Sequence, residues 1–292
     1  MSNIKVIEKK GSLPGKTLVV LSGIHGDEFC GVKAFDNILP TLEITSGTVY
    51  FIYSNLEAIR QNKRFTEKNL NRCFLKQQPQ DISETLEGKT AREIIPYLDI
   101  ADAVLDIHAS FTKDSIPFVI CDEKWIETAG IFDSDITICN FDPFEPGSTD
   151  YYMNLRGKPG FCFECGFLED FKTQKTAEKA IINFLIYFGA INGKVQMKRQ
   201  TKLKLNRLYW NIRGPFKLVK YFKDFEKLNK KTLIGYDGNE KVYANTRNII
   251  LFARDRDKLN EECFLTAKEL KNITKKQARM ALNKLIYISE NR

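Results

Sequence analysis

The sequence lacks several patterns, and each absence excludes a class of protein. Its 292 residues contain no apolar run of about 18 residues, so no membrane-spanning helix is expected. There is no internal repeat and no low-complexity tract, which argues against a repeat protein or a disordered chain. The first residues, Met1 to Lys5, lack the apolar segment of a signal peptide. These absences together predict a cytoplasmic protein.

Cysteine usage agrees with a reducing compartment. The chain has seven cysteines, an odd number scattered along its length, so a disulfide framework is not expected. Cys162 and Cys165 have the spacing of a metal or redox motif, but they stand in an extended apolar run. Alternation along a strand points the two thiols to opposite faces, which argues against a zinc knuckle or a redox pair.

Charge is unevenly distributed. Residues 1–193 carry 20 Lys and Arg against 27 Asp and Glu, whereas residues 194–292 carry 25 against 10. This asymmetry predicts a domain boundary near Gly193. The basic half either forms a basic surface or docks on the acidic half, and no aromatic-interleaved basic motif suggests a nucleic-acid partner. The oligomeric state stays open.

The chain has only two histidines, the residue type that most often binds metals or transfers protons near neutral pH. His25 follows the apolar run 18–21, and His108 ends the run 103–107. Glu28 stands three residues after His25, on a turn between the strand and the helix predicted over 28–39. Such strand ends are where ligands bind in open α/β sheets. Two His and one Glu match a catalytic zinc site with an open fourth position, although a lone histidine there is more often structural.

The order of elements predicts an α/β fold. Further strands are expected over 48–53, 116–121, 136–139 and 161–167, and helices over 85–98 and 176–188. Residues 1–17 are expected to be a lead-in that ends in a turn at 13–16. After a connector, residues 205–246 alternate short strands with turns, and 248–252 is the last expected strand. Capping boxes at Thr266 and Thr274 then predict two C-terminal helices.

Three other positions carry polar groups in informative surroundings. Glu164 stands inside an apolar strand, where a carboxylate is costly unless it has a partner or a task. Asp106 precedes His108 by two residues on the same strand face and is either a partner of the histidine or a cap. The cationic stretch 55–74 includes Arg64 and Arg72, whose guanidinium groups suit carboxylates, but it also reads as a solvated loop.

The ordered set of motifs resembles the succinylglutamate desuccinylase/aspartoacylase family. These motifs are Gly-Ile-His25-Gly-Asp-Glu28, then Arg64, then Asn-Leu-Asn71-Arg72, then Asp-Ile-His108, and finally Phe-Glu164-Cys-Gly. The resemblance covers about residues 18–190. It implies a zinc-carboxypeptidase-like three-layer domain with a mixed central sheet over 1–193. A smaller all-β domain over 194–265 and a basic helical tail over 266–292 are expected to follow.

The resemblance also implies a role for each motif residue. His25, Glu28 and His108 would bind one zinc ion per chain. Glu164 would be the general base that activates the attacking water and later protonates the leaving amine, and Arg64 would stabilise the oxyanion.

Four more residues resemble the family's substrate-binding groups. Asn71 and Arg72 would hold a substrate carboxylate. Tyr152 and Arg156 resemble a Tyr/Arg pair that precedes the catalytic glutamate, although the gap from Arg156 to that glutamate is two residues shorter than in aspartoacylases. The Pro-Gly that often follows the Phe of the Asn-Leu-Asn-Arg motif is also missing.

Two further departures from the family pattern concern substrate choice. Asn69 stands where many members have Asp, which changes the local support of Arg72. Residues 253–257 contain no pocket tyrosine, which argues against specificity for N-acetylaspartate, and Arg254 or Arg256 there would change the preferred acid.

The leading hypothesis is a zinc-dependent amidohydrolase acting on a small anionic N-acyl amino acid. A zinc carboxypeptidase that cleaves a short peptide shares most of this machinery and is the alternative. A third hypothesis is a binding protein that uses its basic half to hold an acidic partner or a nucleic acid.

Overall fold

A computed structural model describes residues 2–270 of the chain. The strands are β1 (Lys5–Lys10), β2 (Leu13–Ser22), β3 (Ser46–Tyr53), β4 (Ala103–Ser110), β5 (Phe118–Cys121), β6 (Ile136–Cys139), β7 (Gly160–Phe167), β8 (Thr201–Trp210), β9 (Phe216–Leu218), β10 (Glu226–Leu228), β11 (Thr232–Asp237), β12 (Glu240–Ala244), β13 (Asn248–Leu251) and β14 (Glu262–Glu269). The helices are α1 (Phe29–Ile38), α2 (Leu56–Gln61), α3 (Gln80–Ser83), α4 (Leu86–Ile100), α5 (Thr149–Asn154) and α6 (Thr173–Tyr187), with 3-10 turns η1 (Leu70–Arg72), η2 (Glu123–Trp125) and η3 (Thr128–Ile131).

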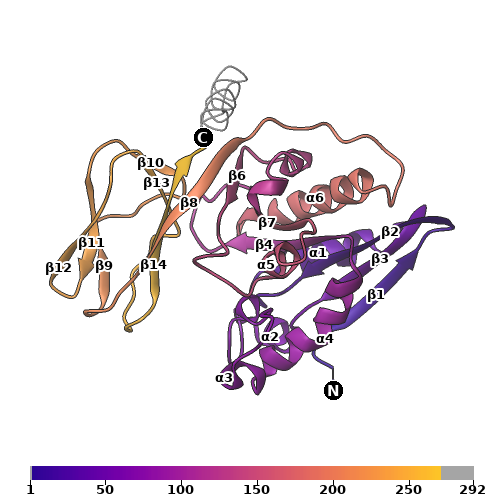
Figure 1. The fold of residues 1–292 in the computed structure, drawn as a ribbon, viewed down its shortest axis with the longest axis horizontal. Coiled ribbons are helices and arrows are strands. Elements are labelled where there is room, and N and C mark those ends of the chain that lie inside the picture. The colour runs from indigo at the N-terminus through magenta and orange to yellow at the C-terminus, as the bar shows by residue number, and fades with distance from the viewer. Residues whose placement is uncertain (1, 271–292) are drawn as a thin grey trace, which may run out of the picture.

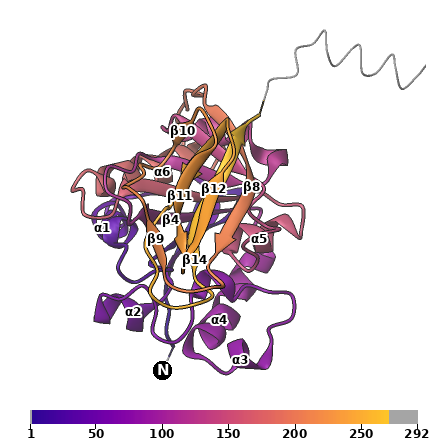
Figure 2. The ribbon, with the colours of Figure 1, turned by 90° about the vertical axis from the view of Figure 1, so that its left-hand side faces the viewer.

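One large mixed sheet organises the molecule, in the order β1-β3-β2-β4-β7-β5-β6-β8-β14-β13-β10. Strands β3, β2, β4 and β7 are parallel neighbours, and β5 joins β7 antiparallel. A second sheet has the order β12-β11-β9 (Figures 1 and 2). It lies beside the strands β14, β13 and β10, which form one end of the first sheet. The expected α/β fold with a mixed central sheet is therefore confirmed.

Helices cover both faces of the central strands, and the sequence of β2 shows why. Leu18 and Val20 point into a core built with α1 and α6, whereas Val19 and Leu21 point into a second core built with α4 and η1. All four side chains are fully buried. A strand covered on both faces has to be apolar at consecutive positions, which is the pattern of parallel sheets.

The chain start differs from expectation. The predicted lead-in forms β1, which pairs antiparallel with β3, and β2 already begins at Leu13, where a turn was expected. β1 is an edge strand rich in Lys and Glu, so its sequence carries little strand signal. The β2–β3 register shifts between Leu13 and Thr17, which accommodates the Pro-Gly pair within the strand.

The C-terminal part corrects two predictions. Thr266 does not begin a helix but lies within β14, between β8 and β13, so the strand at 248–252 is not the last one. Phe264, Leu265 and Ala267 are buried there, and pairing with two neighbouring strands outweighs the local capping signal. The helix predicted from Thr274 lies outside the described residues.

The two halves of the chain are joined by one continuous sheet. β8, the first strand after residue 193, pairs parallel with β6. Lys198, Lys202 and Lys204 form ion pairs with acidic residues before the boundary, namely Asp133, Asp135, Glu127 and Glu123. Part of the basic half thus docks on the acidic half. No helix among residues 2–270 has the length and apolar content needed to cross a bilayer.

A prediction about stability follows from the junction. Leu203 of β8 is buried in a cluster with Ile138 of β6 and Leu265 of β14. Leu203→Ala is expected to lower the free energy of unfolding by about 2–5 kcal/mol, because it leaves a cavity between the halves. Urea denaturation measures this, with exposed Leu13→Ala as the control. A loss similar to that of the control, or two separate unfolding transitions in the wild type, would contradict a shared core.

Candidate metal centre and active site

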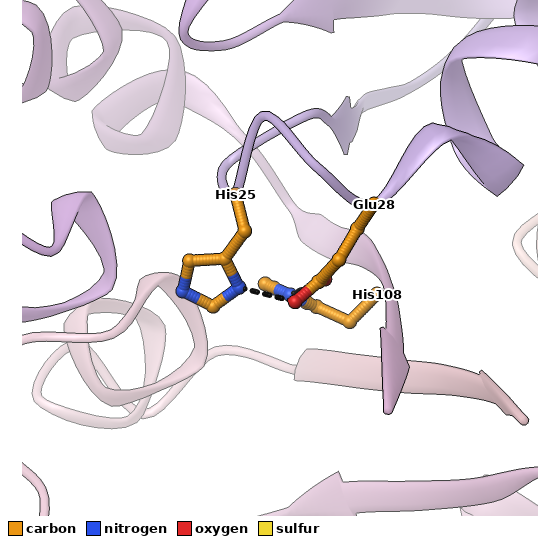
Figure 3. Close-up of side chains that lie close together, drawn as sticks. All are labelled: His25, Glu28 and His108. Carbon is orange, nitrogen blue, oxygen red and sulfur yellow. Dashed lines mark hydrogen bonds and ion pairs between the residues drawn. The ribbon is translucent and has the colours of Figure 1, made fainter. Parts of the chain in front are cut away.

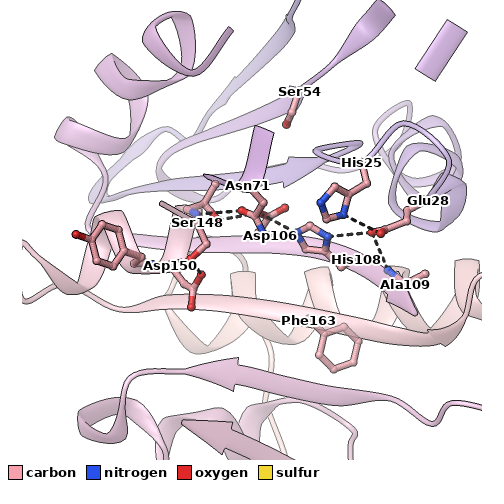
Figure 4. Close-up of polar contacts among 12 residues, drawn as sticks. His25, Glu28, Ser54, Asn71, Asp106, His108, Ala109, Ser148, Asp150 and Phe163 are labelled. Carbon is pink, nitrogen blue, oxygen red and sulfur yellow. Dashed lines mark hydrogen bonds and ion pairs between the residues drawn. The ribbon is translucent and has the colours of Figure 1, made fainter. Parts of the chain in front are cut away.

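The candidate site lies where β2, β4 and β7 end. The turn after β2 carries His25 and Glu28, β4 carries His108, and β7 carries Glu164. His108 and Glu164 are register partners in the parallel β4–β7 pair, so the sheet itself places them side by side. Figure 4 shows the two histidines and Glu28 gathered at this edge. Because β2, β4 and β7 are parallel neighbours, their ends meet at one edge of the sheet and bring together residues that are far apart in sequence.

Glu28 is the centre of the cluster. Its Oε1 lies 2.8 Å from Nδ1 of His25, and its Oε2 lies 2.9 Å from Nδ1 of His108 (Figure 3). The Ala109 backbone N–H also donates to Oε2, at 3.1 Å. All three side chains are buried. Burial opposes ionisation of Glu28, but the two histidines outweigh it and hold the pKa of Glu28 well below its usual value.

The second nitrogen of each histidine faces a polar side chain on the far side of the ring from Glu28. Nε2 of His25 lies 3.0 Å from Oδ1 of Asn69, and Nε2 of His108 lies 3.1 Å from Oδ2 of Asp106. The hydroxyl of Thr149 donates to the same Asp106 oxygen at 2.7 Å. Asp106 is therefore a partner of His108, one of the two expectations for it. The Asn69 side chain contacts His25 and accepts from the Asn71 backbone N–H, whereas Arg72 is held by Asn69 only through the backbone, at 2.9 Å from the Arg72 N–H to the Asn69 carbonyl.

This donor set fits a zinc ion. The candidate ligand atoms of His25, Glu28 and His108 lie within 4.8 Å of one another. Burial, together with the Arg64 charge, lowers the pKa of His25 to about 4, so its imidazole is neutral, as a metal ligand must be. Burial acts in the same direction on His108, but Asp106 and Glu28 outweigh it and raise the pKa of His108, so a metal would have to displace a proton from that ring. A polar side chain opposite the far nitrogen of each ring leaves the nearer nitrogen for a metal, the usual arrangement around protein-bound zinc.

Glu164 faces the same pocket without a polar partner. Its Oε2 accepts no hydrogen bond from any described residue, and its carboxylate lies close to His108 and Cys162. Burial, and secondly the charge of Glu28, raises the pKa of Glu164 to about 8. A carboxyl group of this kind exchanges protons near neutral pH, which is the property required of a general acid or base.

Arg64, Asn71 and Arg72 come from the loop after α2. Nη1 of Arg64 donates to Oε1 of Glu28 at 2.9 Å. Oδ1 of Asn71 accepts from the Thr149 backbone N–H at 3.3 Å, which ties the loop to α5. Arg72 donates through Nη1 to the Asn71 carbonyl at 2.9 Å. All three predicted residues line the pocket, so the loop is not merely a solvated connection.

One buried carboxylate, which the sequence analysis missed, holds this loop. Glu87, in the first turn of α4, accepts hydrogen bonds from the backbone N–H groups of Thr66, Glu67 and Lys68, and from the Thr66 hydroxyl. Asn55 donates to it as well. Burial opposes ionisation, but these donors keep the pKa of Glu87 below its usual value. Glu87 is fully buried in the structure, and no local sequence pattern indicates that burial.

The pocket has about 810 Å³ of space, including its open mouth. The C-terminal half supplies one wall, which includes Phe252, Arg254, Glu262 and Phe264. Of the two arginines suggested to influence the preferred acid, Arg254 lines the pocket and Arg256 does not.

Tyr152 and Arg156 are not brought to the pocket. The Tyr152 hydroxyl donates to Asp99 at 2.7 Å, and the guanidinium of Arg156 stacks 3.6 Å from the centre of the Tyr152 ring while also bonding Asp99. Tyr152 packs into the core under α4. Ser148, which caps α5, and Asp150 within it contribute to the pocket lining instead. Figure 4 shows these two side chains in contact with each other. Tyr152 and Arg156 are therefore left out of the site proposed below.

Comparison with known proteins agrees with the motif pattern. The succinylglutamate desuccinylase/aspartoacylase catalytic domain matches residues 14–188. The N-alpha-acetyl-L-2,4-diaminobutyric acid deacetylase of Halomonas elongata is 26% identical over 217 residues, which are 68% of this chain and 62% of that protein. The probable aspartoacylase of a Nostoc species is 26% identical over 263 residues, 80% of this chain and 88% of that one. The chain thus spans less than two thirds of the Halomonas relative.

Solved structures show the same fold. The succinylglutamate desuccinylase of Vibrio parahaemolyticus superposes with a TM-score of 0.75 at 17% identity and covers 92% of each chain. The product-bound ectoine utilization protein EutE (DoeB) of Ruegeria pomeroyi superposes with a TM-score of 0.70 at 20% identity, covering 91% of this chain and 88% of that one.

The support behind His108 yields one prediction. Asp106→Asn is expected to weaken zinc affinity about 10- to 100-fold, because the carboxylate no longer orients the imidazole. Competition with a chromogenic chelator measures the affinity, and exposed Asp102→Asn at the start of β4 is the control. Unchanged affinity in Asp106→Asn would show that this contact does not support metal binding.

The hydrogen bonds from the loop at 66–68 to Glu87 lead to another prediction. Glu87→Ala leaves the backbone N–H groups of Thr66, Glu67 and Lys68 without their acceptor, at a cost of about 1–3 kcal/mol for each group that water does not reach. Thermal and urea denaturation should show a loss of at least about 2 kcal/mol. Glu84→Ala, which removes an exposed carboxylate from the neighbouring turn, is the matched control. Equal stability of the two variants would mean that the loop does not depend on Glu87.

Proposed function

Because the chain belongs to the succinylglutamate desuccinylase/aspartoacylase family, we propose that it is a zinc-dependent amidohydrolase that removes the acyl group from a small N-acyl amino acid. The observation that carries the proposal is the convergence of His25, Glu28 and His108 in one pocket with the unpartnered carboxyl of Glu164. The relatives named for acetyl-diaminobutyrate, aspartate and succinylglutamate substrates support the class of reaction.

Zinc is the proposed cofactor, one ion per chain, held by His25, Glu28 and His108. When bound, the ion polarises the scissile carbonyl and lowers the pKa of water from about 15.7 to about 7. The residues around it are suited to hold such an ion, because both imidazoles have fixed orientations and the carboxylate stands between them.

Proton transfer is assigned to Glu164. It takes a proton from the attacking water and returns that proton to the amine as the C–N bond breaks. The raised pKa of this carboxyl supports the second task, since a proton held near neutral pH is available for transfer. The overall change is the addition of one water across the amide, which yields a carboxylic acid and a free amino acid.

Arg64 is assigned to charge stabilisation. Its guanidinium already lies beside Glu28 and can donate to the carbonyl oxygen as negative charge develops there. Asn71 and Arg72, with Arg254 opposite, are assigned to the carboxylate of the substrate, since arginine groups bind carboxylates through paired N–H donors.

The cytoplasm is the proposed location. All seven cysteines are free and buried, which suits a reducing compartment.

The carboxypeptidase alternative differs in what the pocket must admit. Strands β13 and β14 with their connection wall one side of the site, which favours a compact substrate over an extended peptide. A nucleic-acid or acidic-protein partner for the basic half has less support, because several of its lysines are engaged by acidic residues of the first half.

The test uses zinc-reconstituted protein and mass-spectrometric detection of products from N-acetyl, N-formyl and N-succinyl amino acids and short peptides. Hydrolysis of at least one N-acyl amino acid is expected. Glu164→Gln should lower kcat at least about 100-fold while zinc content stays at one per chain, because the general base is lost. Exposed Glu169→Gln is the control. Cleavage of peptides alone would favour the carboxypeptidase, and no hydrolysis by zinc-loaded protein would contradict the proposal.

A further inference from the structure

The pocket contains more acidic groups than the proposed catalysis uses. Glu28 and Glu164 have tasks in the reaction, but Glu145, Asp150 and Glu262 also line the cavity. Glu145 and Glu262 both face the guanidinium of Arg72. A pocket designed only for an anionic substrate would gain nothing from these additional carboxylates, since like charges in a partly desolvated site repel.

Of the three carboxylates without a task in the reaction, Asp150 is the one without a cationic partner among the described residues. Its side chain is buried, lines the pocket and forms no ion pair with any residue from 2 to 270. Its one side-chain hydrogen-bond donor is the Ser148 hydroxyl. Burial raises the pKa of Asp150 to about 6, yet the group still ionises at neutral pH. A buried anion without a cation is costly unless a ligand supplies the positive charge.

Among the positively charged residues of the pocket, one likewise lacks a partner of opposite charge in the part of the chain that the structure describes. Arg64 is paired with Glu28, and Arg72 with Glu145 and Glu262. Arg254 forms no ion pair within the described chain; its guanidinium lies 4.0 Å from the centre of the Phe111 ring, and its Nε has no acceptor. The pocket therefore holds one uncompensated cation, Arg254, and one uncompensated anion, Asp150, besides the catalytic groups.

We propose, on the basis of the function proposed above, that the substrate is an N-acyl amino acid whose side chain ends in a protonated amine. Arg254 binds the α-carboxylate, and Asp150 binds the side-chain ammonium, with Glu145 as a second carboxylate in the lining of the same pocket. Such a ligand is anionic at one end and cationic at the other, with no net charge, which matches the two uncompensated groups. The substrate would then differ from the anionic one that the sequence suggested.

The arrangement of α5 explains why acidic side chains are disfavoured. A Tyr/Arg pair was expected from this segment, and it would have supplied a cation. Tyr152 and Arg156 instead contact Asp99, and the segment presents the carboxylate of Asp150 to the cavity. A second carboxylate on the ligand would meet this anion, so the same residue both attracts amines and rejects acids.

Three ligand types of similar size test the charge preference. They are the N-α-acetyl derivatives of diamino acids with one to four side-chain methylene groups, of norvaline, and of aspartate. Binding is measured by calorimetry on zinc-loaded Glu164→Gln protein, in which turnover is suppressed, and hydrolysis is measured separately on the wild type. At least one amine-bearing ligand is expected to bind about tenfold or more tightly than both the norvaline and the aspartate derivative.

Variants then assign the preference to a residue. Asp150→Asn is expected to reduce the ratio of amine to norvaline affinity at least about tenfold, because an amide does not compensate an ammonium. Asp135→Asn removes an exposed carboxylate that does not line the pocket, and it should keep the wild-type ratio. Glu145→Gln should lower the ratio as well, which provides a second test if Asp150→Asn folds poorly.

The two assays separate this inference from the function on which it rests. Hydrolysis of the aspartate or norvaline derivative in preference to every amine-bearing ligand would overturn the inference and leave the amidohydrolase standing. Preferential binding of an amine without hydrolysis of any ligand would support the charge recognition and contradict the proposed function. Equal binding of all ligand types, no binding of any, or an unchanged ratio in Asp150→Asn would overturn the inference.

Discussion

The burial of one carboxylate, that of Glu28, sets the requirement that the surrounding structure meets. Its two oxygens receive groups from three separate segments: His25 on its own turn, Arg64 from the loop after α2, and His108 with the Ala109 backbone from β4. An isolated ion in such a place would be strongly destabilising. The strand ends and the loop must therefore be held together accurately before this residue is tolerated, and the same accuracy makes them fit for chemistry.

That accuracy comes from a further set of polar contacts behind the cluster. Asp106 steadies His108 and is itself bound by Thr149, while Asn69 steadies His25. Glu87 holds the backbone of the loop that bears Asn69, Arg64 and Arg72. Buried polar groups that satisfy one another in this way restrict the backbone to one arrangement. Packing of apolar residues on both faces of the sheet stabilises the fold, and these polar contacts fix the positions of the side chains at the candidate site.

The sequence was most informative where a local pattern decides the outcome. Apolar runs predicted the buried strands, and the scarcity of histidine directed attention to His25 and His108, which the fold brings together. It was least informative where distant partners decide. Thr266 carries a helix-start signal, but β8 and β13 draw its segment into a sheet. The orientation of α5 and of the residues that follow it, with Asp150 inward and Arg156 outward, depends on how this segment packs on β7, β4 and α4, and no spacing rule predicts that.

The sheet continuity across residue 193 has a consequence for how such a protein diversifies. The side chains at the metal centre stand on strands and loops of the first half, whereas Arg254 and Glu262 reach the same cavity from β13, β14 and the segment between them. In the proposed complex Arg254 holds the α-carboxylate from that late wall, whereas Asp150 and Glu145, which select the side chain, belong to the first half. Substitutions in the second half would therefore change how firmly the constant end of the substrate is held, and a change in the accepted side chain calls for substitutions at or near α5.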